Sequence, residues 1–340
     1  MAYALSGEGR QQLDQLLVRT AQAFNSQVGK QFSATPSGAQ TIMQKIVEQG
    51  DSFLKMINVL PVSDMKGDKI LLGLTGRVAS RTNTATPGNK RSAKRLANTD
   101  AQGYELFDTN FDVALAYNTI DVWSKFPNFA ELYMKAVREA IQNDILQAGW
   151  TGTSAEANTD IVTNPLLQDL NKGWFQLLRT YNGGSQHVAG TELAPIQLGG
   201  FDFPTLDSLV HDAKQRIAPQ FRQRPDLVAL IADDLLADQD ATYYESQGNT
   251  PTEKALLRDT KITRAFGGLP TISPAFMPNG SVLVTPLANL SVYYQSTSVR
   301  RTQRDNPEQS QVEEFNSMNM GYVVEEELAA SFVENVTLVE

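Results

Sequence analysis

The pattern of apolar positions is clearest over residues 126–149, where it predicts one long α-helix. Apolar residues recur there at spacings of three and four, which places them on one helical face: Phe129, Leu132, Tyr133, Ala136, Val137, Ala140, Ile141, Ile145 and Ala148. Pro127 suits the first helical turn, and Gly149 suits a left-handed residue at the C-terminus. Glu131 and Lys135 are spaced to pair across one turn of the polar face, which also includes Gln142. We expect an amphipathic core helix.

Strands are predicted before this helix by a period of two. We expect strands at 59–63 and 69–78, and a long strand region over 104–122 whose alternate residues share one face. Residues 80–103 between them have almost no apolar side chains and cannot form a core of their own. A loop of this length inside a compact domain is typically functional or disordered. We expect an extended two-stranded tongue.

The remaining pattern mixes helices and strands. A short amphipathic helix and a polar linker occupy the first 35 or so residues, and a helix then begins near Thr35-Pro36. After the long helix, the predicted elements are helices at 165–178, 206–217 and 255–266, a buried strand at 227–231, and strands at 271–276, 281–285, 291–294, 322–324 and 330–339. Strands on both sides of a helical middle predict an α+β fold.

The charge is unevenly distributed along the chain. The net charge is −9, yet one stretch carries six basic residues against Asp100, so that subtracting its +5 leaves −14 elsewhere: Arg77, Arg81, Lys90, Arg91, Lys94 and Arg95. Residues 311–340 carry seven glutamates and no Lys or Arg. Such poles can orient subunits against each other. They are equally consistent with a solvated loop and a solvated tail.

Composition excludes several classes of function. The 340 residues suffice for one large or two ordinary domains, and the absence of cysteine with only two histidines excludes disulfides and thiolate or histidine-rich metal sites. Asp108-x-Asn110-x-Asp112 lacks the glycine of a calcium loop, and Asp233-Asp234 is better explained by helix capping. The phosphate-binding and hydrolase motifs are missing, so we expect no enzyme, no cofactor and no metal. Without a long apolar run or a secretory signal, we expect no membrane association and synthesis in the cytoplasm.

Several phrases occur together in a consistent order from about residue 30 onwards. They include Phe32-Ser-Ala-Thr-Pro-Ser37, Asn58-Val-Leu-Pro-Val-Ser63, Asn164-Pro-Leu-Leu-Gln-Asp169 with Gly173-Trp174, Leu287-Ala-Asn-Leu-Ser-Val-Tyr-Tyr294 and Tyr322-Val-Val-Glu325. With Arg300-Arg301, Asn306-Pro307 and Ser317-Met-Asn319, they resemble the major capsid proteins of temperate contractile-tailed bacteriophages of the peduovirus type.

The resemblance implies the tailed-phage capsid fold, also called the Hong Kong 97 fold. It divides the chain into an N-terminal scaffold-like segment at 1–30, an arm at 31–60 and an extended loop at 61–122. A peripheral domain follows at 123–219 with its spine helix at 126–149, then an axial domain at 220–300 and a return to the peripheral domain at 301–340. It also implies clipping of the N-terminal segment by a phage protease, for which we select Lys30, Gln31 and Phe32.

The implied function is a virion shell subunit that forms hexamers and pentamers around packaged double-stranded DNA. A scaffold protein, a prohead protease and a portal are its implied partners. The basic loop would contact a neighbouring subunit. Two alternatives are a cellular nanocompartment shell that encloses cargo enzymes and, less well matched, a nucleic-acid-binding protein that uses the same loop. The net charge of −14 outside the loop opposes nucleic-acid binding.

Overall fold

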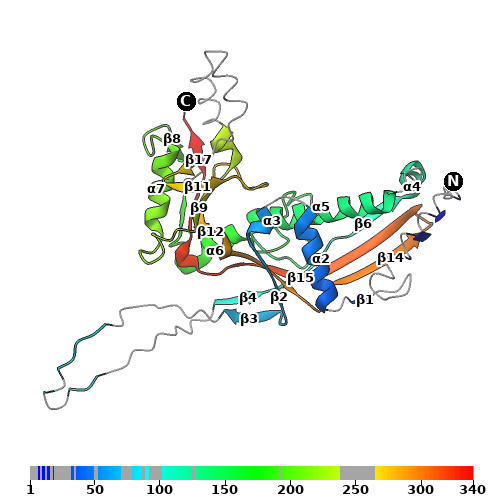
Figure 1. Cartoon of the computed structure of the whole chain (residues 1–340). Helices are drawn as coiled ribbons and strands as arrows, with labels where there is room; N and C mark the ends of the chain where they lie inside the picture. The colour runs from blue at the N-terminus through cyan, green and yellow to red at the C-terminus, as the bar shows by residue number, and fades with distance from the viewer. Residues whose placement is uncertain are drawn as a thin grey trace, which may run out of the picture.

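The computed structural model describes residues 32–33, 36–49, 53–69, 79–83, 85, 89–91, 102–123, 128–191, 193–237 and 265–339, with isolated positions between 7 and 18. Figure 1 shows an elongated body, a second compact unit at one end of it and a narrow sheet that leaves the body between them. The expected mixture of helices and strands is confirmed.

The body is built on a seven-stranded sheet whose central strand is β15 (Gln311–Val324). Ser317 of β15 pairs with Arg300 on one side and with Asn110 on the other. The first side carries β13 (Leu290–Gln295) and β14 (Arg300–Asn306), and the second carries β5 (Phe107–Asn110) and β6 (Val113–Ala116). On the first side the edge strands are β2 (Asn58–Val62), parallel to β13, and β1 (Phe32–Ser33), antiparallel to β14. On the second side β5 and β6 themselves form the edge.

Helices cover one face of this sheet. The longest is α5 (Phe129–Thr151), which lies along the body and is crossed by α2 (Pro36–Gln49), as Figure 1 shows. The other helices around the body are α3 (Phe53–Met56), α4 (Tyr117–Trp123) and α6 (Trp174–Thr180). The buried side chains of α2, α3, α5 and α6 form one continuous core with β13 and β15, whereas those of α4 form a small separate cluster. Three aromatic residues, Trp150, Trp174 and Phe175, are completely buried at its centre.

The second unit contains a six-stranded sheet in the order β10-β11-β9-β12-β16-β7. Its helix α7 (Leu206–Arg216) contacts β12 and β16 and begins with a Thr205–Ser208 capping box. The strands are β7 (His187–Ala189), β9 (Leu227–Ile231), β10 (Ala265–Phe266), β11 (Leu269–Ile272), β12 (Val282–Pro286) and β16 (Ser331–Glu334). Beside it β17 (Val336–Leu338) pairs with β8 (Ile196–Leu198).

These two sheets do not follow the predicted division of the chain at residue 300. β13 precedes that residue but belongs to the large sheet, whereas β16 follows it and pairs with β12 of the smaller sheet. The strands of the C-terminal 40 residues are therefore shared between the two units. The domain boundaries themselves stay predictions.

The long helix differs in detail from its prediction. It ends at Thr151, so Gly149 lies inside it, and Pro127 lies outside the described residues. A Cβ atom on Gly149 would lie 2.5 Å from the Trp174 ring, so close packing explains this glycine. Lys135 pairs with Glu139 at 3.6 Å, not with Glu131.

Exposure along α5 also differs from the predicted apolar face. Leu132, Ala136 and Ala140 are exposed, because the N-terminal half of α5 contacts the core only through a single row of residues spaced four apart. This row consists of Phe129, Tyr133, Val137 and Ile141. Gln142, on the predicted polar face, is buried.

Other predicted elements need correction. Residues 117–123 form α4 and not a strand, because Tyr117 and Ile120, three residues apart, are buried together against Val312. Residues 164–173 are turns and irregular backbone, with Leu167 in the left-handed region, and the helix begins only at Trp174. Ala265–Phe266 is a strand; the rest of the helix predicted at 255–266, and all but the first residue of the strand predicted at 69–78, lie outside the described residues.

Candidate functional site

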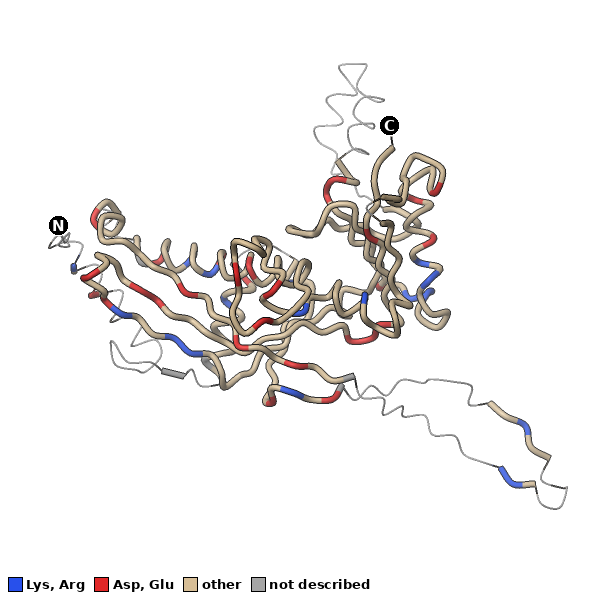
Figure 2. Tube along the Cα trace, turned by 180° about the vertical axis from the view of Figure 1, so that it is seen from behind, with Lys and Arg blue, Asp and Glu red and all other residues tan. Residues whose placement is uncertain are grey.

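The predicted basic loop follows a narrow two-stranded sheet formed by β3 (Lys66–Lys69) and β4 (Gln102–Glu105). Tyr104 anchors β4 to the body by an edge-on contact with the Tyr293 ring, with centroids 5.1 Å apart. The described stretches 79–83 and 89–91 lie beyond this sheet and away from the body (Figure 1). Figure 2 shows basic positions on both stretches.

Three of the six predicted basic residues can be placed. Arg81, Lys90 and Arg91 are all exposed, whereas Arg77, Lys94 and Arg95 lie outside the described residues. At the base of the loop, Lys66 and Glu105 form an exposed ion pair with a 2.5 Å separation. A surface pair of this kind contributes at most about 1 kcal/mol. Because Arg81, Lys90 and Arg91 are exposed, their positive charges face solvent in the isolated chain.

The predicted cleavage region is only partly placed. Lys30 and Gln31 lie outside the described residues, and Phe32 belongs to β1, where it pairs with Arg301 of β14. Further upstream, Arg10 Nη1 lies 2.7 Å from Asp305 Oδ2, and Tyr117 donates a hydrogen bond to Asp305. Residue 10 is thus held near the free end of β14.

The acidic C-terminal segment is not a solvated tail. Glu314 is buried and pairs with Arg301 at 2.6 Å, and Glu313 pairs with Arg304 at the same distance. Glu325 accepts hydrogen bonds from Ser291 and Tyr293. These carboxylates therefore satisfy partners within their own chain.

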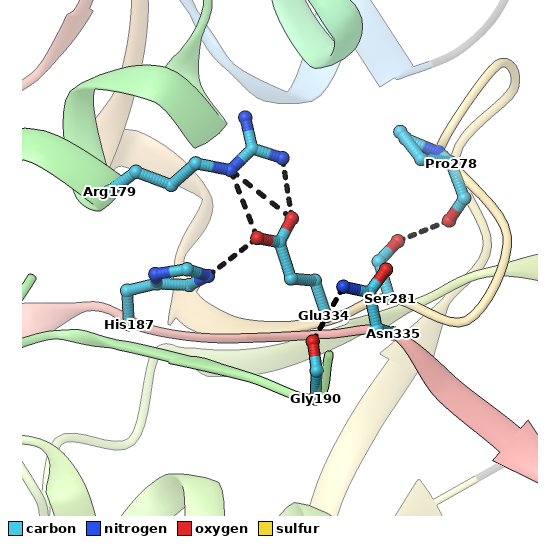
Figure 3. Close-up of polar contacts among 7 residues, drawn as sticks. All are labelled: Arg179, His187, Gly190, Pro278, Ser281, Glu334 and Asn335. Atoms are coloured by element: carbon cyan, nitrogen blue, oxygen red, sulfur yellow. Dashed lines mark hydrogen bonds and ion pairs between the residues drawn. The ribbon is translucent and has the colours of Figure 1, made fainter. Parts of the chain in front are cut away.

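Glu334 lies at the centre of a further polar cluster, drawn in Figure 3. Its carboxylate accepts a hydrogen bond from Arg179 Nη2 at 2.5 Å and contacts His187 Nε2 at 2.8 Å. Burial by itself raises the pKa of this carboxyl, but the hydrogen bonds from His187 and Arg179 together outweigh it and lower the pKa to about 2. The guanidinium and the imidazole also lie against the Phe332 ring.

This cluster joins structural elements and does not assemble a nucleophile. It connects α6, β7 and β16. Ser281 in Figure 3 donates its hydroxyl hydrogen bond to the Pro278 carbonyl, not to the imidazole. Within the described ranges, acidic and histidine side chains form no group that could hold a metal ion, and no helix has the length and apolar character to cross a membrane.

A groove that the sequence did not reveal lies between α2, α5 and the strands β14 and β15. It encloses about 250 Å³. Apolar side chains line it, among them Ile42, Ile46, Val137, Ile141 and Met318. Lys45, Arg138, Arg300 and Arg301 also line it, with Glu314 as the one acidic residue. The lining residues come from three distant parts of the chain, which is why no local pattern predicts the groove.

Comparisons with known proteins define the class first. The chain superimposes on a subunit of the satellite phage P4 procapsid including size determination (Sid) protein, with a TM-score of 0.77, 32% identity and 99% coverage of both chains. It shares the fold of a cyanophage A-1(L) capsid chain, with a TM-score of 0.53, 14% identity and coverage of 85% and 93%. The α+β fold is thus that of a tailed-phage capsid subunit.

The sequence then defines the family. The model for phage major capsid proteins of the P2 family matches residues 12–336. A capsid protein of Escherichia phage P2 is 35% identical over 91% of this chain and 88% of its own length. The chain therefore belongs to the P2 family of phage major capsid proteins, a structural family that builds the phage head.

Proposed function

We propose that this chain assembles as hexamers and pentamers into an icosahedral head around double-stranded DNA, and that its basic loop contacts a neighbouring subunit. The observation that carries the loop's role is the exposure of Arg81, Lys90 and Arg91 beyond the β3–β4 sheet, away from the body. Opposite charges on a neighbour would steer and orient the contact. The loop would become ordered on contact, because it has too few apolar residues to fold alone.

Three glutamates of the acidic C-terminal segment are poor partners for the loop. Glu313, Glu314 and Glu334 already pair with arginines of their own chain. Withdrawing a buried carboxylate from its partner is costly, since it leaves an unpaired charge behind. The loop would therefore meet other exposed carboxylates of the neighbour.

We also propose a scaffold protein, a prohead protease and a portal as partners during assembly in the host cytoplasm. Residues 1–30 would act as a scaffold-like segment and be removed by cleavage near Lys30, Gln31 and Phe32. The weakness of the Arg10–Asp305 ion pair is consistent with easy release of the segment after cleavage. Arg10 is half exposed, and a surface pair contributes only about 0–1 kcal/mol.

The loop's role is tested by reversing Arg91, Lys94 and Arg95 to Glu together. A matched variant reverses the exposed Lys55, Lys135 and Arg216 outside the loop, so that both variants change the net charge equally. Assembly is followed by size-exclusion chromatography with light scattering and by negative-stain electron microscopy. We expect the loop variant to lose shells while it keeps the helix content of the unassembled chain, and the control to form them.

Normal shells from the loop variant would refute the loop's role. Wild-type protein that forms no shells or rings with its scaffold would refute the proposed assembly itself. Salt-dependent DNA binding by the unassembled wild-type chain, lost in the loop variant, would instead favour the nucleic-acid-binding alternative.

A further inference from the structure

The loop between α5 and α6, residues 152–173, is held in one conformation by hydrogen bonds. The backbone N–H groups of Thr153 and Ser154 donate to the Gln168 carbonyl, at 2.7 and 3.0 Å. Asp160 accepts hydrogen bonds from the Val162 N–H and from the Thr163 hydroxyl, at 3.0 and 2.6 Å. Its own N–H donates to the buried Asp169 carboxylate at 2.7 Å. We call residues 152–173 the α5–α6 loop.

This ordered loop presents apolar side chains to solvent. Ile161 is 73% exposed, Val162 86% and Leu166 49%. Single exposed apolar residues are common, but three together on a fixed loop are typical of a protein-binding surface. The exposed carboxylates of Glu156 and Asp160 lie in the same loop, and no basic residue occurs between 152 and 171. The surface is thus apolar at its tip and acidic around it.

The groove between α2 and α5 has the complementary character. Ile42, Ile46 and Ile141 supply an apolar floor, and Lys45, Arg138 and Arg300 add positive charge to its lining. Its volume of about 250 Å³ is large enough to receive apolar side chains from outside. No residue of the α5–α6 loop lines this groove in the same chain.

We propose that the α5–α6 loop of one subunit inserts Ile161 and Val162 into the groove between α2 and α5 of a second copy of this chain. Glu156 and Asp160 then face the cations Lys45 and Arg300 of that copy. The inference rests on the proposed assembly into shells and names one contact within them.

The groove of a second copy fits this surface better than the basic loop of that copy does. Residues 80–103 have almost no apolar side chains and cannot cover Ile161 and Val162. The basic loop is equally unsuited to the groove, whose lining carries charge of the same sign. Of these two pairings, the one between the α5–α6 loop and the groove matches apolar with apolar side chains and acidic with basic ones.

The two surfaces also lie at different positions along α5, which favours a head-to-tail contact. The groove residues on α5 end at Ile141 and the helix ends at Thr151, a separation of about 15 Å along the axis. A contact between two different surfaces of identical subunits generates rings when the rotation closes. The geometry is therefore suited to capsomers.

Cross-linking tests the contact directly, because the chain contains no cysteine. Val162→Cys and Lys45→Cys chains are mixed, co-assembled with scaffold and treated with a short bismaleimide linker. We expect a cross-linked dimer of the two chains in shells, and no cross-link when Leu193→Cys replaces Val162→Cys as the exposed control. A cross-link from residue 162 to Lys90→Cys, without one to residue 45, would overturn the proposal in favour of the basic loop.

Charge reversal provides a second test that does not depend on a cross-linker. Glu156→Lys and Lys45→Glu should each lower the yield of shells by about five-fold, and their combination in one chain should restore it. If wild-type protein forms shells, but the mixed Val162→Cys and Lys45→Cys chains give no cross-link in their shells and the double charge reversal gives no rescue, the contact alone is refuted. If wild-type protein forms no shells, it is the proposed assembly that fails.

Discussion

Gly149→Ala provides a sharp test of the packing in the core, because helix propensity and steric crowding predict changes of opposite sign in the free energy of unfolding. Inside a helix, Ala is normally about 1 kcal/mol more favourable than Gly. Here the new Cβ would lie 2.5 Å from Cζ3 of Trp174, which is fully buried and packs at 4.8 Å from the Trp150 ring. The Trp174 ring also donates a hydrogen bond to the Ser291 carbonyl at 3.0 Å. The ring therefore has little freedom to move.

The magnitude follows from these contacts. Overpacking a core costs about 1–3 kcal/mol, and displacement of the Trp174 ring would add about 1 kcal/mol for its hydrogen bond. Against the helical gain, we expect a net loss of about 1–3 kcal/mol in the free energy of unfolding. Urea unfolding of the unassembled chain, followed by tryptophan fluorescence, measures this loss.

Two further variants separate the effect of helix propensity from that of overpacking. Ala140→Gly, at an exposed position of the same helix, should lose only the propensity term of about 1 kcal/mol. In a double-mutant cycle with Trp174→Phe, the smaller ring should reduce the cost of Gly149→Ala. If Gly149→Ala instead stabilises the chain by about 1 kcal/mol, the assignment of this glycine to the Trp174 contact is wrong.

Three other predictions follow from burial and charge. The Glu334 pKa falls from 4.5 to about 2 on folding, so its contribution, on the order of 3 kcal/mol, is present above pH 4.5 and is lost as the pH falls through 2. Glu334→Gln should flatten the acid dependence of the unfolding free energy over this window, and an unchanged slope would contradict it. Leu146→Asp buries an unpaired carboxylate and should abolish soluble folded protein, whereas Leu132→Asp on the same helix should not. Thr205→Ala removes the cap of α7 and should cost about 1 kcal/mol in chemical unfolding; no loss would exclude a stabilising cap.

Local patterns predicted those elements in which buried residues recur at the period of a helix or follow one another in a short apolar strand. The helix over 206–217 and the strand over 227–231 are confirmed within one residue. The strands β14 and the first half of β15 were not predicted, because buried polar residues such as Glu314 interrupt the alternation. Arg301 compensates that carboxylate, and it becomes its neighbour only through the pairing of the two strands.

The candidate site divides in the same way. The basic loop is visible in the sequence because its charges are contiguous, and the structure places Arg81, Lys90 and Arg91 in solvent. The acidic segment looks like a second pole, but Glu313, Glu314 and Glu334 pair with arginines that lie elsewhere in the sequence. A cluster of like charges in a sequence indicates an exposed site only where no oppositely charged side chain pairs with it in the folded chain.

The large sheet has a consequence for the time at which a subunit becomes competent to assemble. Its edge strands β1 and β2 come from the first 62 residues, but their partners β14 and β13 begin only at residues 300 and 290. The groove likewise needs residues 41–46 together with residues 299–318. A nascent chain on the ribosome therefore has the α5–α6 loop well before it has the groove that would receive it. Neighbouring nascent chains on one messenger RNA cannot engage each other through this contact until translation is nearly complete.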